Sequence, residues 1–136
     1  MNSGRLIEVK DFETMTVSRV ETPNVDLSVV IPTFNESHGI SQILRSLHSS
    51  LKELQINFEI ILVDDDSPDD TWKIAAELMK EIPELTVIRR VGVKGLATAV
   101  ICGWHYSNGQ LLGVMDGHGQ HPTEVKNALF EVFNEN

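Results

Sequence analysis

Short apolar runs alternate with longer helical patterns from Leu27 onward, and this alternation restricts the fold more than any other feature of the sequence. The apolar runs cover residues 27–31, 58–63, 85–88 and 111–115. Apolar residues recur at helical spacing over residues 40–54, 71–82 and 95–106, and again from Pro122. Strands that alternate with helices predict an α/β fold, in which a parallel sheet carries helices on both faces. Ligands of such sheets bind beyond the carboxyl ends of the strands, so the polar residues after each strand are the candidates for a site.

The chain has 136 residues, which is the length of one domain. Residues 1–26 are polar and weakly patterned, which predicts a flexible N-terminal arm with at most a short strand around residues 15–20. The packed domain is expected to span residues 27–136. Four predicted strands make a thin sheet with an exposed edge. We therefore expect either a truncated piece of a longer enzyme or a chain whose sheet edge pairs with a second copy as a homo-oligomer.

The charge balance excludes some classes of partner. Lys and Arg number 11 and Asp and Glu number 20, so the net charge is −9. Such an acidic chain is a poor candidate for binding nucleic acid or an anionic lipid surface through charge alone. No run approaches the roughly 18 apolar residues of a membrane-spanning helix, and no signal peptide is visible. The one cysteine, Cys102, excludes an internal disulfide and fits a reducing compartment, so we expect a cytoplasmic location.

An acidic loop directly follows the second predicted strand. The loop has a purely structural explanation, in which Asp66 or Ser67 makes an Asx-type turn and Asp69 or Asp70 caps the next helix. That interpretation does not explain Asp64 and Asp65, which lie at the expected ligand edge of the sheet. A carboxylate there can accept hydrogen bonds from a base or a ribose. If Asp65 has that role alone, its removal should weaken nucleotide binding and leave the melting temperature nearly unchanged.

Two further loops carry weaker signals. Asp116, His118 and Gln120 follow the fourth predicted strand and place oxygen and nitrogen donors on one side of an extended segment. Such a set suits a divalent cation that holds a diphosphate, while a glycine-rich turn with a helix cap explains the same residues equally well. The glycine-rich stretch 89–96 contains Lys94, which could bind phosphate at the start of a helix, although the stretch matches no established phosphate-binding motif.

Taken together, these loops resemble the family-2 glycosyltransferases of the GT-A fold, and most closely the dolichol-phosphate and polyprenyl-phosphate mannosyltransferases. The matching segments are VVIPTFNE at 29–36, ILVDDDSPDDTW at 61–72, RRVGVKGLATAVICG at 89–103 and VMDGHGQHPTE at 114–124. The resemblance implies the Rossmann-like, nucleotide-binding half of that fold. It implies a nucleotide site formed by Pro32, Phe34, Glu36, Val63, Asp65, Asp116 and Gly117. It also implies a divalent metal held by Asp116, His118 and Gln120.

The activity implied by the resemblance is transfer of a hexose, with inversion, from a nucleoside diphosphate sugar to a polyprenyl or dolichyl phosphate. The expected donor is GDP-mannose, and the location is the cytoplasm or the cytoplasmic face of a membrane. The resemblance also implies an acceptor half and membrane contacts that this chain lacks, so we expect no transfer by the chain alone. His118 stands where the family has the second acid of its Asp-x-Asp motif, which favours manganese over magnesium.

The residues leave open three alternatives to a mannosyltransferase that uses GDP-mannose. A related enzyme could use UDP-glucose, because the sequence does not separate GDP from UDP. The chain could also bind nucleotide without catalysing transfer. A phospho-receiver domain is a third class, but its acidic cluster should follow the first strand of the domain, whereas here the cluster follows the second.

Overall fold

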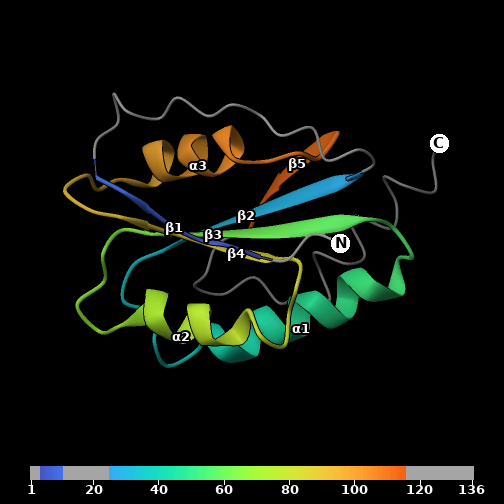
Figure 1. The fold of residues 1–136 in the computed structure, drawn as a ribbon, viewed down its shortest axis with the longest axis horizontal. Helices are drawn as coiled ribbons and strands as arrows, with labels where there is room; N and C mark the ends of the chain where they lie inside the picture. Colours follow the sequence, from blue (N-terminus) through green and yellow to red (C-terminus); the bar gives the residue numbers. More distant parts are fainter. Residues whose placement is uncertain (1–3, 11–24, 116–136) are drawn as a thin grey trace.

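The computed structural model describes residues 4–10 and 25–115, and these form one parallel sheet with helices on both faces (Figure 1). The strands are β1 (Leu6–Val9), β2 (Leu27–Thr33), β3 (Phe58–Asp64), β4 (Leu85–Arg90) and β5 (Leu111–Val114). The helices are α1 (Ile40–Glu53), α2 (Thr71–Leu78) and α3 (Leu96–His105). The predicted α/β class is confirmed.

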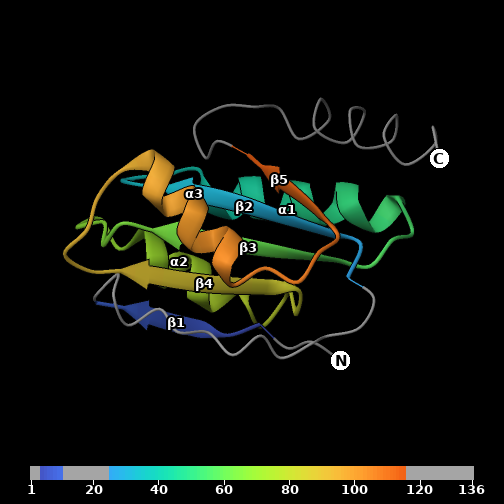
Figure 2. The same ribbon diagram turned by 90° about the horizontal axis from the view of Figure 1, so that it is seen from above.

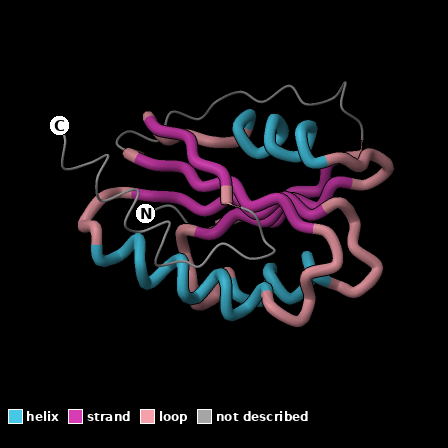
Figure 3. Tube along the Cα trace, turned by 180° about the vertical axis from the view of Figure 1, so that it is seen from behind, coloured by secondary structure: helices cyan, strands magenta, loops and turns pink. Residues whose placement is uncertain are grey.

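The alternating side chains of β2 explain why both faces of the sheet are covered. Leu27, Val29 and Ile31 pack into a core with the apolar side of α1 and α2. Val30 points to the opposite face and packs with Ala99 of α3. Figure 3 shows the resulting three layers, with α3 on one side of the sheet and the other two helices opposite. None of the described helices is long and apolar enough to cross a membrane.

The segment predicted to be a flexible arm contributes a strand, so that prediction is wrong for Leu6–Val9. β1 pairs in parallel with β4, and Val9 is buried in the core between the sheet and α3. Four residues with a single apolar alternation carry little signal of their own, because such an edge strand is stabilised by pairing with its neighbour. The strand expected around residues 15–20 and the helix expected after Pro122 lie outside the described residues.

Two predicted boundaries also differ from the structure. β2 continues through Pro32 to Thr33, although the sequence pattern ended that strand at Pro32. Helix α2 ends at Leu78, and the following turns carry Ile82 back into the core, with its amide donating to the carbonyl of Leu78 at 2.9 Å. The helical spacing of apolar residues therefore extends one turn beyond the helix itself.

The strand order places a natural ligand position next to β2. The sheet runs β1-β4-β3-β2-β5, so the chain moves outward from β2 to β4 and then returns to the other side of β2 (Figure 2). The order of strands thus reverses between β2 and β5. Ligands of open parallel sheets bind at such a reversal, beyond the carboxyl ends of the strands.

Candidate functional site

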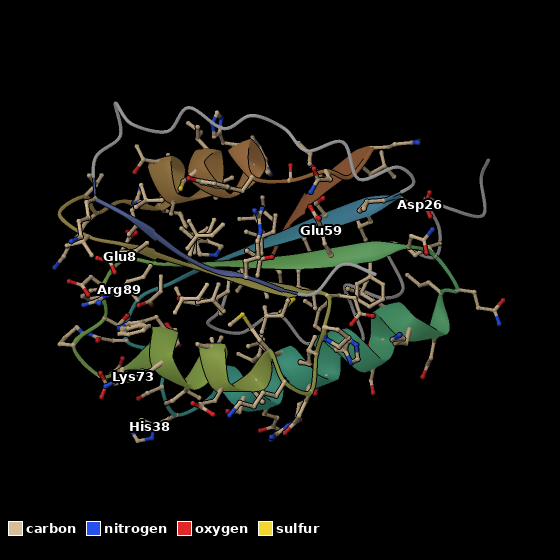
Figure 4. All side chains as sticks on the ribbon, in the orientation of Figure 1. Glu8, Asp26, His38, Glu59, Lys73 and Arg89 are labelled. Atoms are coloured by element: carbon tan, nitrogen blue, oxygen red, sulfur yellow. The ribbon has the colours of Figure 1, made fainter. Side chains whose placement is uncertain are left out.

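The carboxyl ends of three strands are level with one another, which brings their loops to one edge of the sheet. Thr33 of β2 pairs in register with Asp64 of β3, and Asp64 pairs with Arg89 of β4. In Figure 4, Arg89 and Lys73 lie at this end of the molecule, and Asp26, which precedes β2, lies at the other. The loops that begin after Thr33, Asp64 and Arg90 therefore surround a single region, which we call the carboxyl edge.

The five described residues of the predicted nucleotide site differ in accessibility. Phe34 is 38% exposed and Glu36 is half-buried, and both belong to the loop between β2 and α1. Pro32 is buried within β2. Val63 is 0% exposed, packed among apolar side chains beneath α3. The side chains of Pro32 and Val63 are therefore buried, and the predicted contacts of these two residues with a nucleotide stay a prediction.

Asp65 is engaged by an arginine that the sequence analysis did not single out. Its two carboxylate oxygens accept hydrogen bonds from Nε and Nη2 of Arg90, at 2.7 and 2.9 Å. The amide of Gly95 also donates to Asp65, at 3.0 Å. Asp65 is 7% exposed and Arg90 is 1% exposed, so the two residues form a buried, bidentate ion pair. Asp65 thus ties the end of β4 to the start of α3, and its predicted contact with a nucleotide stays a prediction.

Asp64 is a structural residue of the acidic loop. It is fully buried and accepts hydrogen bonds from the hydroxyls of Thr33 and Ser67, each at 2.7 Å, and from the amide of Ser67 at 2.9 Å. Burial raises the pKa of this carboxyl, although the hydrogen bonds from Ser67 and Thr33 oppose the rise. The expectation that Asp64 faces a ligand is wrong. A carboxylate without exposed surface also cannot accept a phosphoryl group as a receiver aspartate must.

The cap of α2 is supplied by Asp69. Its carboxylate accepts a hydrogen bond from the amide of Thr71, the first residue of the helix, at 3.1 Å. Asp70 occupies the N-cap position with a left-handed backbone, φ 66°, and makes no capping bond with its side chain. The sequence analysis left the choice between these two aspartates open, and the structure resolves it in favour of Asp69.

Three cationic side chains from β4 and the loop after it lie at the carboxyl edge in different surroundings. Arg89 donates to Asp66 at 2.8 Å, and its guanidinium lies 4.3 Å from the centre of the Trp72 ring. Arg90 is held by Asp65, as described above. The ammonium of Lys94 instead lies over Phe34, 4.8 Å from the ring centre. Lys94 is therefore the cation of this edge that faces the exposed aromatic ring.

The predicted metal residues Asp116, His118 and Gln120, together with Gly117, lie outside the described residues. The chain enters that segment from Met115, which is buried and whose amide donates to the carbonyl of Val30 in β2 at 2.9 Å. Within residues 4–10 and 25–115, no group of three or more His, Cys, Asp or Glu side chains is placed to hold a metal ion.

A parallel sheet whose strand order reverses belongs to the class of open α/β domains, which bind their ligands beyond the carboxyl ends of the strands. The family model of glycosyl transferase family 2 matches residues 28–136, and the chain belongs to this family. The resemblance predicted from the four loop segments is confirmed.

Individual relatives refine this assignment. The chain is 45% identical over 105 residues to a dolichol-phosphate mannosyltransferase of Pyrococcus furiosus, which covers 77% of this chain and 29% of that protein. Among solved structures, TarS of S. aureus matches 81% of this chain and 33% of its own, at 21% identity and a TM-score of 0.63.

A second solved structure is the mannosyltransferase PcManGT of Pyrobaculum calidifontis in complex with GDP-Man and Mn2+. It matches 85% of this chain and 34% of its own, at 20% identity and a TM-score of 0.61. The fold is accordingly that of the GT-A glycosyltransferases, as predicted. The chain spans about a third or less of the length of these three relatives.

Proposed function

We propose that this chain is the nucleotide-sugar-binding part of a glycosyltransferase that moves mannose from GDP-mannose to a polyprenyl or dolichyl phosphate. The observation that carries the proposal is the 45% identity to the dolichol-phosphate mannosyltransferase of Pyrococcus furiosus. The carboxyl edge supports the proposal independently, because exposed aromatic and charged side chains lie there, next to the reversal of strand order. The proposal places the protein at the cytoplasmic face of a membrane, where a lipid phosphate is accessible.

Phe34 is the proposed stacking surface for the nucleobase. It is the exposed aromatic side chain of the β2–α1 loop, at 38% exposure, and it lies beside the reversal point. Stacking of a base on an aromatic ring contributes roughly 1–3 kcal/mol. Lys94, whose ammonium lies over the same ring, is proposed to contact the phosphates that follow the ribose. Glu36 and Asp65 are proposed as further contacts to the nucleoside.

A divalent cation is the proposed partner of the diphosphate. The net charge of the chain is −9, so a bare diphosphate is repelled unless a cation lies between. We assign the cation to Asp116, His118 and Gln120, with Gly117 beside the phosphates, because these residues follow β5 at the reversal point. When bound, the metal stabilises the negative charge that develops on the departing diphosphate. The Mn2+ bound to PcManGT supports the choice of manganese, and imidazole ligation by His118 favours it over magnesium.

The proposed transfer is a single displacement at the anomeric carbon. An oxygen of the lipid phosphate forms the new bond as the bond to the nucleoside diphosphate breaks, which inverts the configuration. The acceptor is already anionic, so the reaction needs no side chain to remove a proton from it.

Calorimetric titration of the chain with GDP-mannose and with UDP-glucose, each in manganese, tests this proposal. We expect GDP-mannose to bind more tightly than UDP-glucose. Phe34→Leu should weaken binding about 5-fold to 150-fold, because it keeps an apolar side chain and removes the stacking face. Phe34→Tyr keeps that face and serves as the matched control. Tighter binding of UDP-glucose would contradict the choice of donor, and absence of binding to both would contradict the nucleotide site.

A further inference from the structure

Three consecutive backbone amides of the β2–α1 loop donate to three side chains of the β3–α2 loop. The amide of Asn35 donates to the hydroxyl oxygen of Ser67 at 2.9 Å. The next two amides, of Glu36 and Ser37, donate to Oγ1 of Thr71 at 3.0 Å and to Oδ2 of Asp69 at 3.1 Å. We call the acceptors Ser67, Asp69 and Thr71 the loop bracket.

The two hydroxyl acceptors of the loop bracket are themselves oriented by carboxylates. The hydroxyl of Ser67 donates to Asp64 at 2.7 Å, and the hydroxyl of Thr71 donates to Asp69 at 2.5 Å. A hydroxyl has one proton, and here each proton is directed at a carboxylate. The oxygen lone pairs therefore face the amides. Ser67 is 3% exposed and Thr71 is 0% exposed, so water does not compete for these positions.

These hydrogen bonds limit the ways in which the β2–α1 loop can bind a ligand. Successive backbone amides beside a sheet edge often bind phosphate. In this protein the amides of residues 35–37 already donate hydrogen bonds to side chains, so they do not bind a diphosphate. The loop contributes through its side chains instead. Asn35, between Phe34 and Glu36, has a left-handed backbone with φ 55°, which asparagine tolerates better than most residues, and its amide is held by Ser67.

We propose that Ser67, Asp69 and Thr71 are positioning residues, which hold the β2–α1 loop so that Phe34 and Glu36 face a nucleotide. This inference rests on the proposed nucleotide-binding function. The three side chains do not touch the nucleotide; they act through the backbone of residues 35–37. A role limited to capping α2 would need Asp69 and the amide of Thr71, and would not include the bonds to three amides of another loop.

The test compares Thr71→Val with Thr71→Ser and with a control, Thr86→Val, on β4 away from both loops. Thr71→Val keeps the shape of the side chain and removes the acceptor for the Glu36 amide. We expect about fivefold to tenfold weaker binding of GDP-mannose in manganese, the effect of one lost hydrogen bond of ordinary strength. Thr71→Ser and Thr86→Val should bind as the wild type does. Faster amide exchange at residues 35–37 in Thr71→Val is expected as a readout that does not depend on the ligand.

Asp69→Ala, which removes the acceptor for the Ser37 amide, is the second variant and should weaken binding in the same way if Thr71→Val fails to fold. A folded variant of either kind with wild-type affinity would overturn the inference and leave the proposed function intact. If the wild type itself binds neither GDP-mannose nor UDP-glucose, both the proposed function and this inference are overturned.

Discussion

Arg90 is a charged side chain with 1% exposure, and its position depends on Asp65. Burial of an ion costs several kcal/mol unless a partner and further hydrogen bonds compensate it. Asp65 provides the partner, and the carbonyl of Gly95 accepts a further bond from Nη2 of Arg90 at 2.9 Å. Among the described atoms, Nη1 of Arg90 has no hydrogen-bond partner. The hydrogen bonds that offset the burial of this charge are therefore incomplete even in the wild type.

Removal of Asp65 should therefore destabilise the protein. We expect Asp65→Ala to lower the free energy of unfolding by about 3–5 kcal/mol, because it leaves the guanidinium of Arg90 buried and unpaired. Asp66→Asn is the control, since Asp66 and Arg89 form a pair whose side chains are 35% and 30% exposed, and asparagine tolerates the left-handed backbone of this position, φ 54°. That change should cost at most about 1 kcal/mol. Urea unfolding measures both. Equal stability of Asp65→Ala and the wild type would support the simpler expectation from the sequence, that Asp65 serves a ligand alone.

Asp69 predicts a pH dependence of stability with a definite sign. Burial alone raises the pKa of Asp69, but hydrogen bonds from Thr71 and Ser37 outweigh burial and lower the pKa below its ordinary value of 3.8. The stabilisation is therefore complete above pH 3.8 and is lost as the pH falls through the lower pKa of the folded state. Asp69→Ala should lose roughly 0.5–2 kcal/mol at neutral pH, as other helix-cap changes do.

Urea unfolding of Asp69→Ala and the wild type at pH 7 and at about pH 3 tests this dependence. The gap in stability between the two proteins should narrow at the lower pH. Asp64, whose pKa burial raises, is present in both proteins, and the charge of Asp69 is the smallest of the causes that act on that pKa, so most of its opposite effect cancels from the difference. A gap that is the same at both pH values would contradict the role of the Asp69 carboxylate.

Among the elements, α3 depends on a close approach to the sheet. A Cβ atom at Gly103 would lie 2.5 and 2.9 Å from the two γ-carbons of Val30 in β2. The absence of a side chain at Gly103 therefore lets the helix lie directly on the central strand. The start of α3 is tied in turn to Asp65 through the amide of Gly95.

Gly103→Ala should push α3 away from β2. We expect a loss of about 1–3 kcal/mol in the free energy of unfolding, the usual cost of overpacking. Gly113→Ala in β5 is the matched control, because a Cβ there has its nearest contacts at 3.9 Å. Thermal unfolding compares the two variants. Similar melting temperatures for both would show that α3 adjusts without cost.

Strand β5 is anchored at the amino edge of the sheet, opposite the candidate site. Glu59 of β3 (Figure 4) accepts hydrogen bonds from the hydroxyl of Ser28 at 2.8 Å and from the amide of Asn108 at 2.7 Å. The amide of Gly109 donates to the same hydroxyl oxygen at 2.7 Å. This network fixes the turn before β5, and thereby sets where the chain emerges toward Asp116.

The periodicity of the sequence predicted the elements better than it predicted the site. Buried strands and amphipathic helices leave a local pattern, so seven of the eight elements were expected from Leu27 onward; the eighth, β1, lacks such a pattern. Site roles depend on partners that are distant in sequence. Asp65 and Arg90 lie 25 positions apart, and no local spacing indicates that they form a pair. For the same reason, the sequence did not show that Asp64 is a structural residue. The nucleotide role of Phe34 rests on the family resemblance and stays a prediction.

At the scale of the whole molecule, the net charge of −9 opposes every anionic ligand. Local cations offset part of this charge, but Arg89 and Arg90 are already paired with aspartates. Under the proposed function, a diphosphate at this edge is held by a metal ion as well as by Lys94. The proposed function includes such an ion next to Asp116.

Binding of GDP should accordingly depend on the metal. We expect no measurable binding in EDTA, weak binding in magnesium and tighter binding in manganese, because His118 supplies imidazole in place of a carboxylate. His118→Asp should improve binding in magnesium. Calorimetric titration in the three conditions tests this expectation, and equal affinity in all of them would remove the metal role of Asp116, His118 and Gln120.

The central claim is that a nucleotide sugar binds at the carboxyl edge, where the strand order reverses. Amide hydrogen exchange of the chain, with and without saturating GDP-mannose and manganese, tests this claim most directly. Exchange should slow at residues 91–95, which follow β4 at the carboxyl edge, and at residues 116–121, which include the proposed metal ligands. It should not change at residues 107–110 on the amino edge. Protection confined to residues 107–110, or no protection at a saturating ligand concentration, would contradict the claim.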